Sequence, residues 1–131
     1  MPNPTQSLTV LPGRFAVCRL DAQAAVPDWA FSGDFFSVTR TIDELSIVCS
    51  EAGVPEGVLC ERGWACLKVE GPLDFSLTGV LASLTQPLAE AGISLFVLST
   101  YNTDYLLVKA RDLDRAVAVL AEAEHTIRSE Y

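Results

Sequence analysis

The sequence has few of the residues that build the commonest catalytic and nucleic-acid-binding sites. It contains one histidine, His125, and only 9 Lys and Arg against 17 Asp and Glu, which gives a formal net charge of -8. The basic residues form no run, so the positive patch that a phosphate backbone requires is missing. The shortage of basic residues also disfavours binding to an anionic lipid surface. We therefore expect neither nucleic-acid nor membrane binding.

Long apolar runs are missing as well. No segment approaches the roughly 20 apolar residues that cross a bilayer. The first ten residues, MPNPTQSLTV, contain no basic stretch followed by a long apolar one, so we expect no signal peptide and a cytoplasmic location. Half of the 131 residues are nevertheless hydrophobic. This composition predicts a packed core in one ordinary domain or in two very small fused ones.

The four cysteines do not form a CxxC pair, and His125 is far from them in the sequence. We therefore expect no metal site and no cofactor. Cys18, Cys49 and Cys66 lie within strand-like runs, which indicates reduced residues of the core. A nucleophile needs a neighbouring base, and neither GxSxG nor a phosphate-binding loop occurs, so we expect no enzyme.

Residues 63–131 alternate between strand and helix periodicity. Strand-like runs occur at 63–71, 93–99, 104–110 and 125–129, and helical patterns occur at 77–91 and after Asp112. The order strand, helix, strand, strand, helix, strand is that of the ferredoxin-like βαββαβ fold. It predicts an α+β structure in which an antiparallel sheet carries both helices on one face.

The helix predicted at 77–91 has recognisable ends. Asp74 or Ser76 could cap its start, and Gly92 suits the left-handed position after its end. Pro87 interrupts the pattern and predicts a kink, because its ring removes a helical hydrogen bond. One stripe of this helix is apolar: Leu77, Leu81, Leu84, Leu88 and Ala91.

The first half consists of short strand-like runs separated by Gly and Pro. These runs lie at 7–11, 14–20, 35–41 and 44–50, with single helical turns expected near Asp28 and in 51–57. We interpret this half as a degraded copy of the second half with shortened helices. The predicted units are therefore residues 1–62 and residues 63–131.

The strand at 93–98 is apolar on both faces. Ile93, Leu95 and Val97 alternate with Phe96 and Leu98, whereas a sheet with helices on one face normally has polar residues on the other. We therefore expect another unit or another subunit to cover the second face, and a homodimer is the commonest arrangement.

A polar hexapeptide, STYNTD, separates the two most strand-like segments and covers Ser99 to Asp104. A hairpin needs only two to five loop residues. The hexapeptide can be a hairpin turn closed by side-chain hydrogen bonds, or it can be a binding site.

Two segments carry a resemblance to a known family: VEGPLDFSLTGVLASLTQPLAEAGISLFVLSTYNTDYLLVKARDL and, in the first half, FFSVTRTIDELSIVCSE. They resemble the ACT domain, and in particular short tandem bacterial forms, aspartate kinase regulatory regions and the cytosolic arginine sensors. The resemblance implies two ACT-like units in tandem that bind a small molecule, most often an amino acid, where two units meet.

The resemblance also implies the site residues. The loop that wraps the main-chain end of the ligand corresponds to residues 71–79, and the strand turn also faces the ligand. Asp74 stands where the family has glycine, so a carboxylate there could repel the carboxylate of the ligand or attract a cationic group. The implied ligand-binding residues are Asp74, Phe75, Ser76, Gly79, Ser99, Thr100, Tyr101 and Asp104.

Elementary chemistry is consistent with this site. The free N–H groups at the start of the helix after residue 76 could bind a carboxylate, and Asp104 could accept a charge-assisted hydrogen bond from an ammonium group. The predicted function is an allosteric sensor that binds a small molecule, in the first place an amino acid, and acts as a homodimer on an unidentified target. The alternative is a protein-interaction module of the same fold that binds no ligand.

Overall fold

The chain divides into two compact units. The computed structural model describes residues 5–71 and 78–129. The helical unit comprises residues 5–12, 65–71 and 78–129, and the strand unit comprises residues 13–64. Strand β5 (Cys60–Val69) contributes its first five residues to the strand unit and the remainder to the helical unit.

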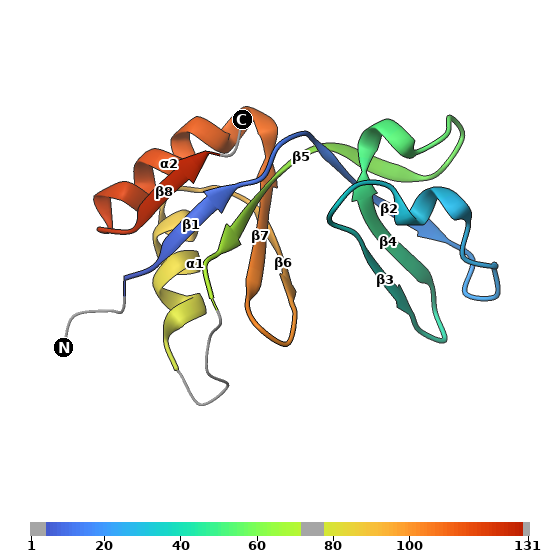
Figure 1. Cartoon of the computed structure of the whole chain (residues 1–131), viewed down its shortest axis with the longest axis horizontal. Helices are drawn as coiled ribbons and strands as arrows, with labels where there is room; N and C mark the ends of the chain where they lie inside the picture. The colour runs from blue at the N-terminus through green and yellow to red at the C-terminus, as the bar shows by residue number, and fades with distance from the viewer. Residues whose placement is uncertain (1–4, 72–77, 130–131) are drawn as a thin grey trace. The chain divides into compact units, whose positions relative to one another are not determined.

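The helical unit has the predicted order of elements from β5 onward: strand, helix, strand, strand, helix, strand (Figure 1). This order confirms the ferredoxin-like α+β fold. The elements that follow β5 are α1 (Val80–Glu90), β6 (Leu95–Ser99), β7 (Asp104–Lys109), the 3-10 helix η3 (Ala110–Asp112), α2 (Leu113–Glu122) and β8 (Thr126–Ser129).

Strand β1 (Ser7–Val10) lies between the first and last strands of this βαββαβ unit, which gives the sheet order β6-β7-β5-β1-β8. Leu8 pairs with Val69 in antiparallel β5 and with Ile127 in parallel β8. The sheet is therefore mixed, whereas the prediction was a purely antiparallel sheet. The prediction also assigned this strand to residues 1–62. The difference arises because an apolar strand pattern reports burial and does not identify the strands that flank it.

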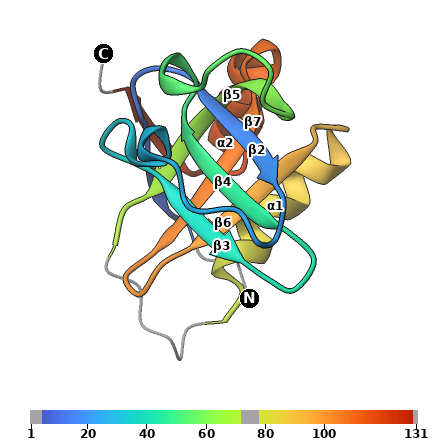
Figure 2. The ribbon, with the colours of Figure 1, turned by 90° about the vertical axis from the view of Figure 1, so that its right-hand side faces the viewer.

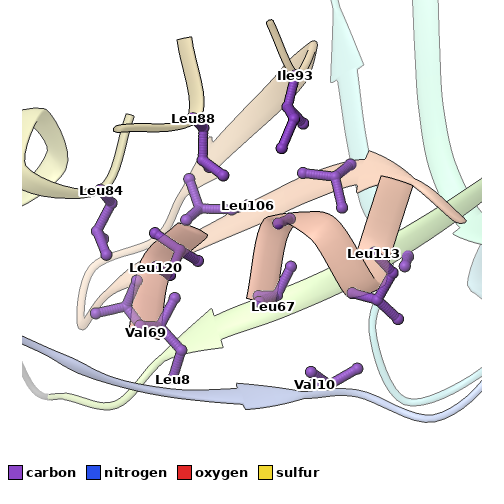
Figure 3. Packing of buried hydrophobic residues seen from close by; sticks show 13 residues of the cluster. Leu8, Val10, Leu67, Val69, Leu84, Leu88, Ile93, Leu106, Leu113 and Leu120 are labelled. Carbon is purple, nitrogen blue, oxygen red and sulfur yellow. The ribbon is translucent and has the colours of Figure 1, made fainter. Parts of the chain in front are cut away.

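Both helices pack on one face of the sheet. Leu84 and Leu88 of α1 and Leu120 of α2 are fully buried against apolar side chains of β1, β5 and β7 (Figure 3). Leu95 and Val97 of β6 extend this core, while Phe96 and Leu98 on the opposite face are half-buried. The expectation that a partner covers this second face stays a prediction.

Helix α1 begins at Val80, three residues later than predicted. Gly79 occupies the N-cap position with φ 81° and ψ -6°, a left-handed conformation that cannot continue a right-handed helix backward. At the other end, Gly92 has φ 73° and so adopts the predicted left-handed conformation. The Gly92 N–H donates to the Ala89 carbonyl, and the Ile93 N–H donates to the Leu88 carbonyl. The predicted caps Asp74 and Ser76 lie outside the described residues.

Pro87 lies within α1, and the helix continues past it to Glu90. Proline has no N–H, so the Ser83 carbonyl one turn earlier loses its helical donor. Nε2 of His125 lies 3.0 Å from this carbonyl oxygen, and Nδ1 of the same ring accepts a hydrogen bond of 2.9 Å from the Gln6 N–H. His125 is thus a buried structural residue, and both of its ring nitrogens are hydrogen-bonded.

Apart from β1, which has no counterpart, the strand unit repeats the strand order of the helical unit, and it lacks the α-helices. Its sheet has the order β3-β4-β2-β5, all antiparallel (Figure 2). The two predicted helical turns are both 3-10 helices. The elements before β5 are β2 (Phe15–Leu20), η1 (Asp28–Phe31), β3 (Ser37–Arg40), β4 (Leu45–Ser50) and η2 (Glu51–Gly53). The matching strand orders support an internal duplication, which stays a prediction.

All four cysteines are free thiols, and the three that were predicted to be buried are buried. Burial raises the pKa of the Cys66 thiol to about 12, so this residue is an unreactive core thiol at neutral pH. In the part of the chain that the structure describes, no helix combines the length and apolar character needed to cross a membrane.

Candidate ligand-binding site

The polar hexapeptide forms the hairpin between β6 and β7. Ser99 and Asp104 are direct cross-strand partners, and the Ser99 hydroxyl donates a 2.6 Å hydrogen bond to Oδ1 of Asp104. The Asp104 side chain is half-buried, whereas Ser99 is exposed. A carboxylate offers about four acceptor positions, so one bond from Ser99 leaves acceptor capacity for a ligand ammonium or guanidinium.

The four residues between these partners form a closed turn. The Thr100 N–H donates to the Thr103 carbonyl at 2.8 Å, and the Thr103 N–H donates in turn to the Thr100 hydroxyl at 3.3 Å. Tyr101, at the tip, is 79% exposed. The hydroxyl of Thr100 therefore stabilises the turn, and the Tyr101 ring is exposed where an incoming molecule could reach it.

Thr103 is a residue that the sequence analysis missed. Its side chain is only 5% exposed, and its hydroxyl donates a 2.5 Å hydrogen bond to the backbone carbonyl of Val69 at the end of β5. This bond fixes the hairpin to the strand from which the predicted binding loop departs. A threonine within a polar turn gives no sequence signal for such a bond, because the acceptor lies 34 residues away.

Hydrogen bonds to β1 also hold the end of β5, on the side opposite to the β6–β7 hairpin. The Glu70 N–H donates to the Ser7 carbonyl at 2.8 Å, and Oε1 of Glu70 accepts a 2.5 Å hydrogen bond from the Thr9 hydroxyl. Glu70 is exposed, so its carboxylate adds a second acid to this end of the unit. Sequence reasoning missed Glu70 because it treated the residue as the end of a strand.

Helix α1 begins at the same end of the helical unit as the β6–β7 hairpin and the end of β5 (Figures 1 and 2). Gly79 is exposed, and its carbonyl accepts the Ser83 N–H at 2.9 Å. Within the described residues no side chain caps this helix. Its first N–H groups and the positive end of its dipole are therefore suited to an anionic group.

The structure thus brings one part of the predicted site together and leaves another part undescribed. Ser99, Thr100, Tyr101 and Asp104 share one hairpin, and α1, whose N-cap is Gly79, begins at the same end of the unit. Asp74, Phe75 and Ser76 lie outside the described residues, so their predicted roles stay predictions. The described residues of this end present two carboxylates, hydroxyl groups and a helix N-terminus.

The strand order and the two helices on one face define a ferredoxin-like α+β domain, and comparison with known proteins identifies its family. The family model described as ACT domain matches residues 59–122, and a second model, described as an N-terminal domain, matches residues 13–57. The chain belongs to the ACT domain family.

Among curated proteins, the chain is 33% identical over 98 residues to cytosolic arginine sensor for mTORC1 subunit 1 of Bos taurus. This match covers 66% of the chain but only 30% of the sensor, so the chain corresponds to less than a third of that relative. The family resemblance seen in the sequence is thereby confirmed.

Solved structures share the fold of this chain. The crystal structure of protein Atu0741 from Agrobacterium tumefaciens is 43% identical with a TM-score of 0.93, and the match covers 98% of this chain and 96% of that one. The regulatory subunit of aspartate kinase from Thermus thermophilus is 11% identical with a TM-score of 0.58 and coverage of 84% and 91%. At this low identity the second match shows the fold alone.

Proposed function

We propose that the protein is a ligand-binding regulatory module that senses an amino acid and performs no catalysis. The observation that carries this proposal is the anchoring of the β6–β7 hairpin to the end of β5 by Thr103. This bond holds the Asp104 carboxylate at the end of the unit where α1 begins. A zwitterion needs donors for its carboxylate and an acceptor for its ammonium, and α1 and Asp104 supply these two functions.

Arginine is the first candidate ligand, because the curated relative is named a cytosolic arginine sensor. Acidic groups also favour a cationic side chain. Asp104 and Glu70 both carry carboxylates at this end, and a guanidinium binds carboxylates with two parallel hydrogen bonds. The proposed location is the cytoplasm, as the name of that relative indicates for the relative itself. We further propose that the protein acts as a homodimer whose geometry changes on binding.

The proposal is tested by thermal unfolding of the full chain in the presence of each of the twenty amino acids. A ligand at 100 times its dissociation constant stabilises the folded state by about 2.7 kcal/mol, which is a readily measured shift. Arginine is expected to give the largest shift. The absence of a shift with every amino acid would contradict the proposal.

Two variants locate the site. Asp104→Asn removes the charge but keeps an acceptor for the Ser99 hydroxyl, so the fold should be retained while the ligand-induced shift decreases sharply. Glu122→Gln removes an exposed charge at the end of α2 and should leave the shift unchanged. A shift that survives in Asp104→Asn would show that the ligand binds elsewhere.

The second candidate function is a protein-interaction module that binds no small molecule. One observation favours it: Ser99 is bonded to Asp104 and Thr100 is bonded to Thr103, so the hairpin already satisfies some of its own polar groups. Binding of a protein partner that is unaffected by any amino acid, together with the absence of thermal shifts, would support this function over the first.

A further inference from the structure

Two cysteines of the strand unit face each other across neighbouring strands. Cys18 of β2 and Cys60 of β5 are direct partners in the antiparallel register. The Arg19 N–H donates to the Leu59 carbonyl at 2.9 Å, so the adjacent pair is hydrogen-bonded and the cysteine pair is of the non-hydrogen-bonded kind.

This type of pair brings side chains close together. Directly opposed residues at non-hydrogen-bonded positions have Cα atoms about 4.5 Å apart. Disulfides span Cα separations of about 4.4–6.8 Å, so a disulfide can join such a pair with little movement of the backbone. Cys18 and Cys60 are thus positioned for bond formation, although both are thiols in this structure.

The two thiols differ in their accessibility. Cys18 is 1% exposed, whereas Cys60 is only partly buried. Both residues line a surface cavity of about 250 Å³ whose apolar wall includes Val17 and the exposed Leu59. A small reagent can therefore reach Cys60 through this cavity, and Cys18 lies behind it.

We propose that Cys18 and Cys60 form a site of reversible oxidation, at which a small disulfide converts the two thiols into an intramolecular disulfide. The sulfur of Cys60, as thiolate, attacks one sulfur of the reagent, forms a mixed disulfide and releases one reagent thiol. The sulfur of Cys18 then attacks the Cys60 sulfur and releases the second reagent thiol. The protein loses two electrons and two protons, and the reagent disulfide is reduced to two thiols.

The order of the two steps follows from the surroundings of Cys18. The pKa of the Cys18 thiol is raised to about 12. Burial is the largest cause, and the neighbouring Cys49 and Cys60 thiols raise the pKa further. Cys18 is therefore a poor first nucleophile, and it reacts only when a mixed disulfide is placed directly opposite it. Burial also raises the pKa of Cys49, which lies on β4 and is fully buried.

A disulfide is a better interpretation of this cluster than a metal site. Within residues 5–71 and 78–129, no group of three or more His, Cys, Asp and Glu side chains is arranged to hold a metal ion. The bond between Cys18 and Cys60 would close a loop that contains all of β3 and β4. It would therefore restrict the unfolded chain and raise the unfolding temperature of the strand unit.

The test is oxidation of the folded full-length protein with bis(2-hydroxyethyl) disulfide, followed by alkylation in denaturant and mass spectrometry. The expected product carries two alkyl groups in place of four, and its non-reduced peptide map contains one peptide that links Cys18 to Cys60. Reduction with dithiothreitol should restore four alkylation sites.

Three variants test the order of reaction. Cys60→Ser should form no intramolecular disulfide, Cys18→Ser should accumulate the mixed disulfide at Cys60, and the control Cys66→Ser should behave like the unsubstituted protein. Four alkylated cysteines after oxidation, a bond that involves Cys49, or a bond that forms only after denaturation would each overturn the proposal. The peptide map of the unsubstituted protein decides the matter even if a variant does not fold.

Discussion

Nε2 of His125 lies 3.0 Å from the carbonyl oxygen of Ser83, the acceptor that Pro87 leaves without its helical donor. Because Nδ1 of the same ring accepts the Gln6 N–H, the proton of the neutral imidazole is on Nε2, where it donates to Ser83. One side chain thus connects α1, the residue before β1 and the residue before β8.

Replacement of His125 should be costly, and the cost should depend on Pro87. His125→Ala leaves the Ser83 carbonyl and the Gln6 N–H without their partner and opens a cavity, so we expect a loss of about 2–4 kcal/mol in the free energy of unfolding. In a Pro87→Ala background, the new N–H at position 87 donates to Ser83, so the same replacement should cost about 1 kcal/mol less. Urea unfolding of the four proteins in this double-mutant cycle measures the coupling. Equal costs in both backgrounds would show that the ring does not replace the missing helical donor.

Thr103 should matter for stability more than any other residue of the hairpin turn. Thr103→Val keeps the shape of the side chain but leaves the buried Val69 carbonyl without its hydroxyl donor, so we expect a loss of about 1–2 kcal/mol. Thr100→Val is the matched control, because Thr100 is exposed and water can replace its hydroxyl. Chemical denaturation compares the two variants. Equal losses would show that the bond to β5 does not hold the hairpin in place.

Cys66 should make the stability of the protein decrease in alkaline solution. Its thiol pKa is raised from 9.0 to about 12 in the folded state, so the unfolded chain loses this proton at a lower pH than the folded chain. The stabilising contribution is complete below about pH 9 and is lost as the pH rises from there toward 12, at about 1.4 kcal/mol per pH unit. Between pH 9 and 10.5, under reducing conditions, the unsubstituted protein should lose about 2 kcal/mol more than Cys66→Ala. Parallel pH profiles for the two proteins would contradict this assignment.

The sequence predicted those features that local pattern encodes. Three of these features are the order of elements in residues 63–131, the left-handed Gly92 that follows α1 and the two short helical turns of the first half. Each depends on periodicity or on a glycine close in sequence. The start of α1 was misplaced because Leu77 fits the apolar stripe, while the left-handed conformation of Gly79 outweighs that fit.

Features that depend on distant partners were not predictable in this way. The bond from Thr103 to Val69 and the contact between His125 and Ser83 join residues 34 and 42 positions apart. No local pattern identifies the backbone carbonyl that such a side chain meets. The same reasoning applies to β1, whose sequence reports a buried strand but not its position between β5 and β8.

The position of β1 has a consequence for the order in which the helical unit can assemble. Strand β1 precedes every other element of the helical unit in the chain, yet one of its two flanking strands, β8, is the last element of that unit. The sheet of the helical unit therefore cannot be completed until β8 has been synthesised. A fragment that begins at residue 63 would leave β8 without the strand that joins it to the sheet, and it should be a substrate for chaperones and proteases.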